Sequence, residues 1–185
     1  MPKVNTQRAG KDYPAEGIKK GDTYYSWAFF RGPTLRSKTY PKPSQLCGSE
    51  KKAAALRAYE DLQDAIAAAT TPEDVKSALE TASSDAQDAI DQYDEAISNL
   101  EDAFPGGCPG LDEANEQRDA LESFQSDCDS AADDIENLDV NDYEVKPEAK
   151  SPEDGGRSWD DLTEEGQSEM LEAAREIAYG PSLEI

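Results

Sequence analysis

The chain has 185 residues, with 18 Lys or Arg against 41 Asp or Glu, no histidine and a formal net charge of −23. Leu, Ile, Val and Phe together contribute only 27 residues, and this shortage beside so high a charge excludes an extensive compact core. Helices that bury narrow seams of Ala and Leu remain compatible with the composition.

Targeting and redox signals are weak. No apolar stretch approaches the roughly 18 residues of a spanning helix, and residues 1–30 contain no apolar run framed as a secretory signal. We therefore expect a soluble intracellular chain that no signal peptide secretes and that makes no membrane contact. Three cysteines without CxxC spacing, Cys47, Cys108 and Cys128, indicate neither a disulfide framework nor a zinc site, so we expect reduced thiols.

The charge divides the chain. Residues 1–45 hold nine Lys or Arg and three Asp or Glu, a net of +6, whereas residues 46–185 hold nine and 38, a net of −29. Such asymmetry favours a basic contact surface joined to an acidic body. The alternative is that the basic part docks on the acidic helices of the same chain.

Residues 1–46 are predicted to form a basic β-hairpin module. The aromatic run 24–31 predicts one strand, residues 31–34 a turn, and residues 35–40 a returning strand. Strand alternation would place Tyr25, Trp27, Phe29 and Arg31 on one face. It would likewise group Arg36, Lys38 and Tyr40 on one face of the return strand.

A hairpin that mixes rings and cations is suited to nucleic acid, because rings stack on bases and Lys or Arg neutralise phosphates. The alternative, which aromatic residues on a hairpin more often follow, is that the rings pack inside the module or against a protein. The candidate contact residues for nucleic acid or a partner are Lys19, Lys20, Tyr24, Tyr25, Trp27, Arg31, Arg36, Lys38 and Tyr40.

Residues 47–138 change to helical periodicity. Apolar residues recur at 4-3 spacing in three segments, and the second segment keeps this spacing from Val75 to Ala103. Thr71 and Pro72 mark a helix start, and residues 105–110, rich in Pro and Gly, end the second helix. Short connections between long helices predict an antiparallel, coiled-coil-like three-helix bundle.

The helical periodicity of apolar residues is absent from residues 139–157 and returns in residues 158–180. Residues 139–157 are polar, with two prolines and two glycines, and are predicted to be a flexible linker. Residues 158–180 are predicted to contain a C-terminal helix with a short apolar stripe that includes Leu171. We expect Trp159 and Leu171 to dock this segment into a groove on the bundle or on a partner.

Catalysis has little support. Without histidine, acid–base work falls to other side chains, and acids scattered over helix surfaces single out no pair, so no catalytic residue is assigned. Cys108 lacks an activating base, and Cys128 occupies a seam position typical of a small buried hydrophobe. The segment 139–144 begins like a calcium loop but lacks its fifth ligand and glycine. We expect no cofactor, no metal and no small-molecule substrate.

Two resemblances concern the N-terminal part. Gly-Asp-Thr-Tyr-Tyr-Ser-Trp-Ala-Phe-Phe-Arg-Gly (21–32), residues 36–40 and a helix near Ser49 resemble the arm-type DNA-binding domain of phage integrases, in which a small sheet precedes a helix. The chain also resembles uncharacterised coil-containing proteins encoded by phages. That resemblance is carried by Gly-Ile-Lys-Lys-Gly-Asp-x-Tyr-Tyr (17–25), by Ser-Lys-Thr-x-Pro-x-Pro-Ser-Gln-Leu (37–46), and by Arg8 followed by Lys-Asp-Tyr-Pro (11–14). It implies a phage setting, in the host cytoplasm or the virion, without an established activity.

These observations predict a mainly α protein with a small N-terminal β-hairpin module, a three-helix bundle and a C-terminal helix. The leading functional hypothesis is a non-enzymatic phage-type adaptor whose acidic bundle binds a protein or a second copy of itself, while the hairpin touches nucleic acid. The first alternative is a virion structural or assembly component without a nucleic-acid role. The second is an acidic inhibitor whose carboxylates imitate DNA phosphates.

Overall fold

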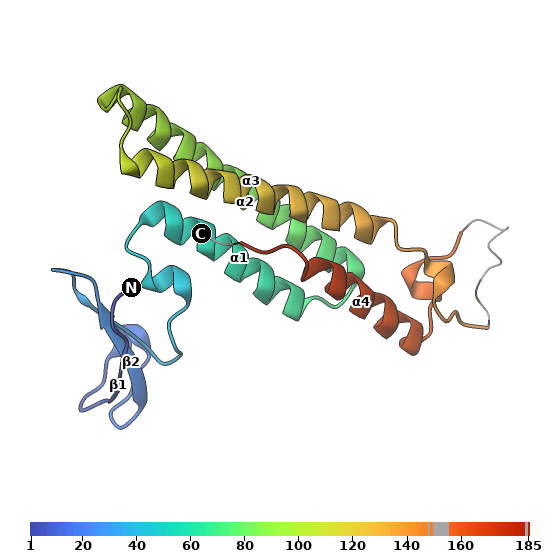
Figure 1. Cartoon of the computed structure of the whole chain (residues 1–185). Helices are drawn as coiled ribbons and strands as arrows, with labels where there is room; N and C mark the ends of the chain where they lie inside the picture. Colours follow the sequence, from blue (N-terminus) through green and yellow to red (C-terminus); the bar gives the residue numbers. More distant parts are fainter. Residues whose placement is uncertain (148, 150–155, 184) are drawn as a thin grey trace. The chain divides into compact units, whose positions relative to one another are not determined.

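The computed structural model describes residues 1–147, 149, 156–183 and 185 (Figure 1). The fold is mainly α, with a small antiparallel sheet at the N-terminus, as the sequence predicts. The chain forms two compact units, residues 1–57 and residues 58–185, and the boundary falls within the first long helix, α1 (Glu50–Ala68). We call these the N-terminal unit and the helical unit.

The sheet of the N-terminal unit has three strands, β1 (Asn5–Arg8), β2 (Thr23–Ala28) and β3 (Thr34–Ser37), in the order β1-β2-β3. The expected hairpin is β2–β3, in which Trp27 lies opposite Leu35. Strand β1 was not predicted, because its sequence Asn-Thr-Gln-Arg is polar and all four residues are exposed. Antiparallel pairing with β2 stabilises β1 as a strand, although its composition does not favour one.

Both strands of the hairpin are shorter than predicted. Arg31 adopts a left-handed backbone conformation (φ 61°), and the turn closes with a 2.9 Å bond from the Gly32 N–H to the Phe29 carbonyl. Strand β3 ends at Ser37, whose hydroxyl accepts the Thr39 N–H at 3.1 Å. Phe29, Arg31, Lys38 and Tyr40 therefore lie outside the strands, and strand alternation does not govern them.

The predicted grouping of Arg36 with Tyr40 is wrong. The Arg36 guanidinium lies 4.6 Å from the centre of the Tyr13 ring, and Tyr13 packs on Tyr24. The Tyr40 ring instead packs edge-on against Tyr25 at 5.3 Å. Tyr24 and Tyr25 are neighbours in β2, and neighbouring residues of a strand point to opposite faces. Arg36 and Tyr40 therefore lie on opposite faces of the sheet.

Both faces of β2 are covered from within the N-terminal unit. On one face Tyr24 forms a buried cluster with Ala9 and Ile18, and its hydroxyl donates to the Gln7 side chain at 2.7 Å. On the other face the Trp27 indole N–H donates to the Gln45 carbonyl at 3.1 Å, in the 3₁₀ helix Pro43–Leu46. Contacts between segments distant in the sequence thus stabilise this unit, rather than one continuous stripe of apolar residues.

The helical unit contains the rest of α1 together with α2 (Pro72–Ala103), α3 (Pro109–Glu136) and α4 (Glu164–Ala178). Helices α2 and α3 lie side by side and antiparallel: the Lys76 ammonium meets the Glu136 carboxylate at 2.6 Å, and Ser83 donates to Asp129 at 2.6 Å. The predicted 4-3 seam is buried from Val75 to Tyr93, through Leu79, Ala82, Ala86 and Ala89. Its last members are not: Ala96 and Leu100 are half-buried and Ala103 is exposed.

The start of α2 follows its sequence signal. The Thr71 hydroxyl accepts the Asp74 N–H at 3.1 Å, and the Asp74 carboxylate accepts the Thr71 N–H at 2.9 Å. This reciprocal capping box satisfies two of the N–H groups that a helix start leaves unpaired. The predicted helical bundle is confirmed. Its coiled-coil character stays a prediction.

The bundle has a fourth helix, which the sequence analysis treated as a separate segment. Helix α4 packs against α2 and α3 and buries Gly166, Met170, Ala174 and Ala178. The Arg175 guanidinium donates to the Ala69 carbonyl at 2.8 Å, just past the end of α1. Of the two docking sites expected for this helix, the structure shows the one on the chain's own bundle.

The predicted linker is structured where the structure describes it up to residue 147. Val140–Asp142 form a 3₁₀ turn, Val145 pairs with Leu162 in a β-bridge, and the Thr163 N–H donates to the Glu144 carbonyl at 3.0 Å. A Cβ at Gly166 would meet that carbonyl oxygen at 2.3 Å, so the segment crosses the start of α4 where the helix has no side chain. The linker positions 148 and 150–155 lie outside the described residues.

Candidate functional site

The two units differ in net charge even more than the two parts defined from the sequence. Residues 1–57 carry 12 Lys or Arg and 4 Asp or Glu, a net of +8, and residues 58–185 carry 6 and 37, a net of −31. Two separately compact parts of one chain thus present opposite charges. Each contains its own candidate surface.

The rings predicted for base stacking divide into buried and exposed ones. Tyr24 and Trp27 are each only 4% exposed, so neither ring can stack on a base while the unit is folded. Tyr25 is half-buried under Tyr40, which is itself 63% exposed. The most exposed ring is Phe30, at 91%, which is not among the predicted contact residues.

The predicted cations differ in the same way. Lys19, Lys20 and Arg31 are exposed. Lys38 pairs with Asp22 at 3.1 Å, whereas Arg36 is half-buried over Tyr13 with Glu16 at 3.9 Å. The Lys19 backbone N–H and the Lys38 side chain hold the pKa of Asp22 below its usual value. Two of the candidate cations are therefore partly neutralised by acids of their own unit.

The turn between β2 and β3 brings a ring and a cation together. The Arg31 guanidinium lies 5.1 Å from the centre of the Phe30 ring, a cation–π contact on an exposed turn. Tyr40 and the exposed lysines lie apart from this turn: Lys38 meets Asp22 next to the start of β2, whereas the turn follows the end of that strand. We use the name basic surface for the exposed rings and cations of the unit taken together, which are Lys19, Lys20, Phe30, Arg31, Lys38 and Tyr40.

The predicted docking residues Trp159 and Leu171 are half-buried on the chain's own bundle. Trp159 lies in the 3₁₀ helix Trp159–Asp161, and its carbonyl accepts the Gln167 side chain at 3.1 Å. With Met170 and Ile135 it lines a hollow of about 340 Å³ at the end of the bundle. Trp159 thus lies near residues of α2, α3 and α4 of its own chain.

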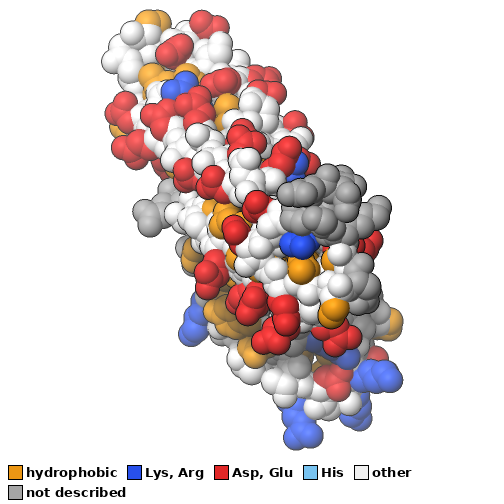
Figure 2. Space-filling model, turned by 90° about the vertical axis from the view of Figure 1, so that its right-hand side faces the viewer, with side chains coloured by type: hydrophobic (Ala, Val, Ile, Leu, Met, Phe, Trp, Pro, Cys, Tyr) orange, Lys and Arg blue, Asp and Glu red, His pale blue; other side chains and the backbone are white. Residues whose placement is uncertain are grey.

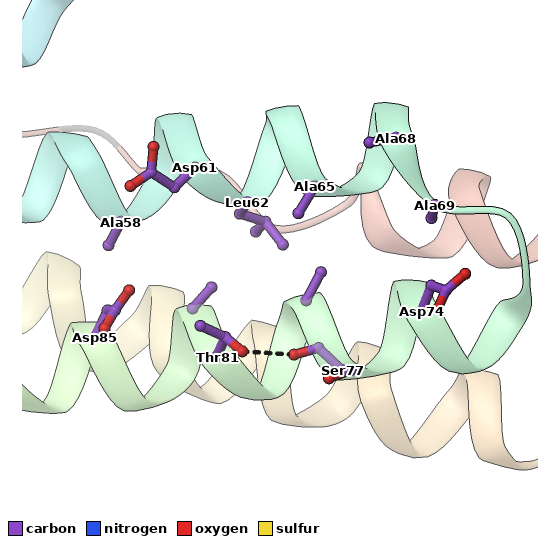
Figure 3. A pocket seen from close by; sticks show the side chains of 12 residues that line it. Ala58, Asp61, Leu62, Ala65, Ala68, Ala69, Asp74, Ser77, Thr81 and Asp85 are labelled. Atoms are coloured by element: carbon purple, nitrogen blue, oxygen red, sulfur yellow. Dashed lines mark hydrogen bonds between the residues drawn. The ribbon is translucent and has the colours of Figure 1, made fainter.

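A larger groove, which the sequence analysis did not find, lies between α1 and α2. Its volume is about 570 Å³, and six of its twelve lining residues are alanines (Figure 3). Ala58 and Leu62 on α1 and Ala82 on α2 are buried and form its floor, whereas Ala65 and Ala68 are exposed at its mouth. Alanine methyl groups are too small to fill the space between two helices whose backbones rarely approach within 8 Å.

The groove combines an apolar floor with an acidic edge. Asp61, Asp74 and Asp85 line it, and none of the described residues that line it is Lys or Arg. The one hydroxyl bond drawn in Figure 3 is internal, since Thr81 donates to the Ser77 carbonyl at 2.8 Å. Hydrogen bonds from Thr70 and Thr71 lower the pKa of Asp74 below its usual value.

Acidic side chains are distributed widely over the helices. Figure 2 shows them scattered across the visible helical surface with apolar side chains between them, rather than gathered in one row. This distribution gives a general negative field in which the groove is one apolar opening. It does not single out any part of the helices as an imitation of a DNA strand.

Reactive groups are few in the described part of the chain. The three cysteines are free thiols, and burial together with Asp129 and Asp127 raises the pKa of Cys128 to about 12. Cys128 is fully buried, as its seam position predicts, while Cys47 and Cys108 are half-buried. Among the described residues no Cys, Asp and Glu side chains form a group that could hold a metal ion, and no helix is long and apolar enough to cross a membrane.

Comparison with protein-family models, curated proteins and solved structures found no match to this chain. The molecule offers two candidate surfaces, the basic surface of the N-terminal unit and the groove of the helical unit.

Proposed function

We propose that this protein is a non-enzymatic adaptor of phage type, which contacts nucleic acid through its N-terminal unit and a protein through its helical unit. The observation that carries the proposal is the coincidence of charge and architecture: a unit of net +8 and a unit of net −31 are each compact. One chain with two oppositely charged units can bring together ligands that would not otherwise associate.

Nucleic-acid contact is supported by the residues of the basic surface. Phosphate contact requires cations that reach solvent, which Lys19, Lys20 and Arg31 do. Base stacking requires an accessible ring, and Phe30 and Tyr40 replace the buried Tyr24 and Trp27 in that role. The helical unit repels phosphate, so contact is confined to the N-terminal unit.

The test is retention of the full chain on single-stranded and double-stranded DNA at about 50 mM salt, where phosphate contact is strongest. We expect retention that falls with added salt and is lost in the variant Lys19→Ala, Lys20→Ala, Lys38→Ala. The matched control carries Arg at the same three positions and is expected to bind like the unchanged chain. Phe30→Ala should weaken single-stranded binding by about 1–3 kcal/mol if the ring stacks on a base.

A second candidate function, a virion structural component, is favoured by one observation, the 91% exposure of Phe30. A ring so exposed on a turn would be buried against a neighbouring subunit. DNA retention that is absent at about 50 mM salt, together with recovery of the chain in purified particles, would overturn the nucleic-acid half of the adaptor and support this alternative.

A further inference from the structure

We infer that the groove between α1 and α2 binds a single cationic, amphipathic helix of a partner protein. The inference rests on the protein-binding half of the proposed adaptor and names the site and the chemistry of the partner.

The length of the groove suits a short helix. Its α1 wall runs from Ala58 to Ala68, which is about 15 Å, or roughly three helical turns, at 1.5 Å per residue. The α2 wall runs antiparallel beside it, from Asp74 to Asp85. Figure 3 shows Leu62 and Ala65 directed from α1 toward α2 across this space.

The side chains of the groove permit close approach. The distance between packed helices depends on the side chains at the contact, and alanine walls allow the shortest distances. The floor is closed by buried residues, and the mouth is open at Ala65 and Ala68. A helix that enters with its apolar face inward would bury methyl groups now in contact with water.

Charge complementarity fixes the sign of the partner. Asp85 lies toward one end of the groove and Asp74 at the other, within a unit of net −31. Lys or Arg on the flanks of an entering helix would meet these carboxylates as its apolar face enters. A second helical unit of the same chain carries 37 Asp or Glu against 6 Lys or Arg, so its helices are repelled.

The test uses the full chain and a labelled synthetic peptide of about 15 residues, made of Lys, Leu and Ala, with Leu and Ala at 3-4 spacing. Fluorescence anisotropy measures binding. A scrambled peptide of the same composition controls for attraction to the acidic surface in general. The variant Ala65→Trp places a large ring in the mouth of the groove. Its matched control is Ala67→Trp, because Ala67 is an exposed residue of the same helix that does not line the groove.

We expect the amphipathic peptide to bind, the scrambled peptide to bind at least tenfold more weakly, and Ala65→Trp to weaken binding about tenfold while Ala67→Trp leaves it unchanged. Asp85→Asn should reduce binding more than Asp88→Asn, whose carboxylate lies outside the groove. Circular dichroism melts confirm that each variant folds.

Three results would overturn the inference: no binding of the amphipathic peptide, equal binding of both peptides, or equal effects of the two Trp variants. Concentration-dependent dimerisation that Ala65→Trp abolishes would instead assign the groove to a second copy of the chain. None of these results bears on DNA retention. A protein that co-purifies equally well with the Ala65→Trp variant would leave the adaptor standing and remove the groove from it.

Discussion

In the N-terminal unit Tyr24 and Trp27 are buried on opposite faces of a single strand, whereas in the helical unit Leu79, Ala86 and Tyr93 are buried on one face of a single helix. The strand is covered by two segments from different parts of the chain, the loop around Ile18 and the 3₁₀ helix Pro43–Leu46. The helix is covered mainly by the next helix along the chain. The spacing of apolar residues along the chain therefore predicts burial well for helix α2 and poorly for strand β2.

The comparison can be measured because each unit contains one of the chain's two tryptophans, Trp27 and Trp159. Variants that keep only one of them, made with Trp159→Phe or Trp27→Phe, report by fluorescence on one unit at a time.

Phe124→Ala should cause the largest loss. The ring is fully buried and packs edge-on against Tyr59 at 5.9 Å. Removing it leaves a cavity, which lowers the free energy of unfolding by about 3–5 kcal/mol. Urea unfolding followed by Trp159 measures this loss. We expect the Trp27 signal to keep its midpoint, and a common shift of both signals would contradict the division into two units.

Cys128 should be far less reactive than Cys47, which lies in the N-terminal unit. With a pKa of about 12 instead of 9.0, Cys128 holds about a thousandfold less thiolate at neutral pH. Alkylation followed by mass spectrometry should label Cys47 and Cys108 first. Because the raised pKa favours the neutral thiol, its stabilising effect is complete below pH 9 and is lost as the pH rises toward 12. Labelling of all three cysteines at one rate would contradict the burial of the seam.

Gly166→Ala should destabilise the helical unit by about 1–3 kcal/mol, since the added Cβ would meet the Glu144 carbonyl oxygen at 2.3 Å. The matched control is Gly110→Ala in the first turn of α3, where nothing lies within 4 Å of the new Cβ. There the better helix propensity of alanine should raise stability slightly. Effects of the same sign at both positions in thermal unfolding would contradict the close crossing over α4.

Thr71→Ala should lower the free energy of unfolding of the helical unit by about 1 kcal/mol, because the hydroxyl that accepts the Asp74 N–H at 3.1 Å is removed. Thr71→Ser keeps a hydroxyl and serves as the control. Urea unfolding followed by Trp159 measures both variants. Equal losses in the two would show that the methyl group of Thr71, and not its hydroxyl, stabilises the start of α2.

Asp74→Asn should give the smallest effect, and that effect should depend on pH. Hydrogen bonds from Thr70 and Thr71 lower the pKa of Asp74, so the carboxylate stabilises the fold fully above its ordinary value of 3.8. This contribution is lost as the pH falls through the lowered pKa. The difference in melting temperature between the variant and the unchanged chain should therefore shrink toward pH 2, and a constant difference would contradict the assignment.

The sequence predicted the elements whose signals are local. Helices α2 and α3 follow from their 4-3 spacing, from Thr71 and Pro72 at one end and from the Pro and Gly loop at the other. The hairpin follows from its aromatic run and turn. Strand β1 could not be predicted in this way, since four polar residues become a strand only when β2 lies beside them.

The candidate surfaces were harder to predict than the fold. Exposure of Phe30 depends on where β2 ends, and burial of Trp27 depends on a carbonyl 18 residues away. The groove depends on the spacing between α1 and α2, which no alanine pattern specifies. The seating of α4 depends on Gly166, whose only sequence signal is a glycine inside an otherwise helical pattern.

The bond from Arg175 to the Ala69 carbonyl joins residues 106 positions apart, and a cation there also suits the negative end of α1. This contact has a consequence for the order of events during synthesis. Domains generally fold as units from the N-terminal side while the chain is still being made, so the sheet can form early. The Ala69 carbonyl, just past the end of α1, can receive the Arg175 guanidinium only after more than a hundred further residues have been translated.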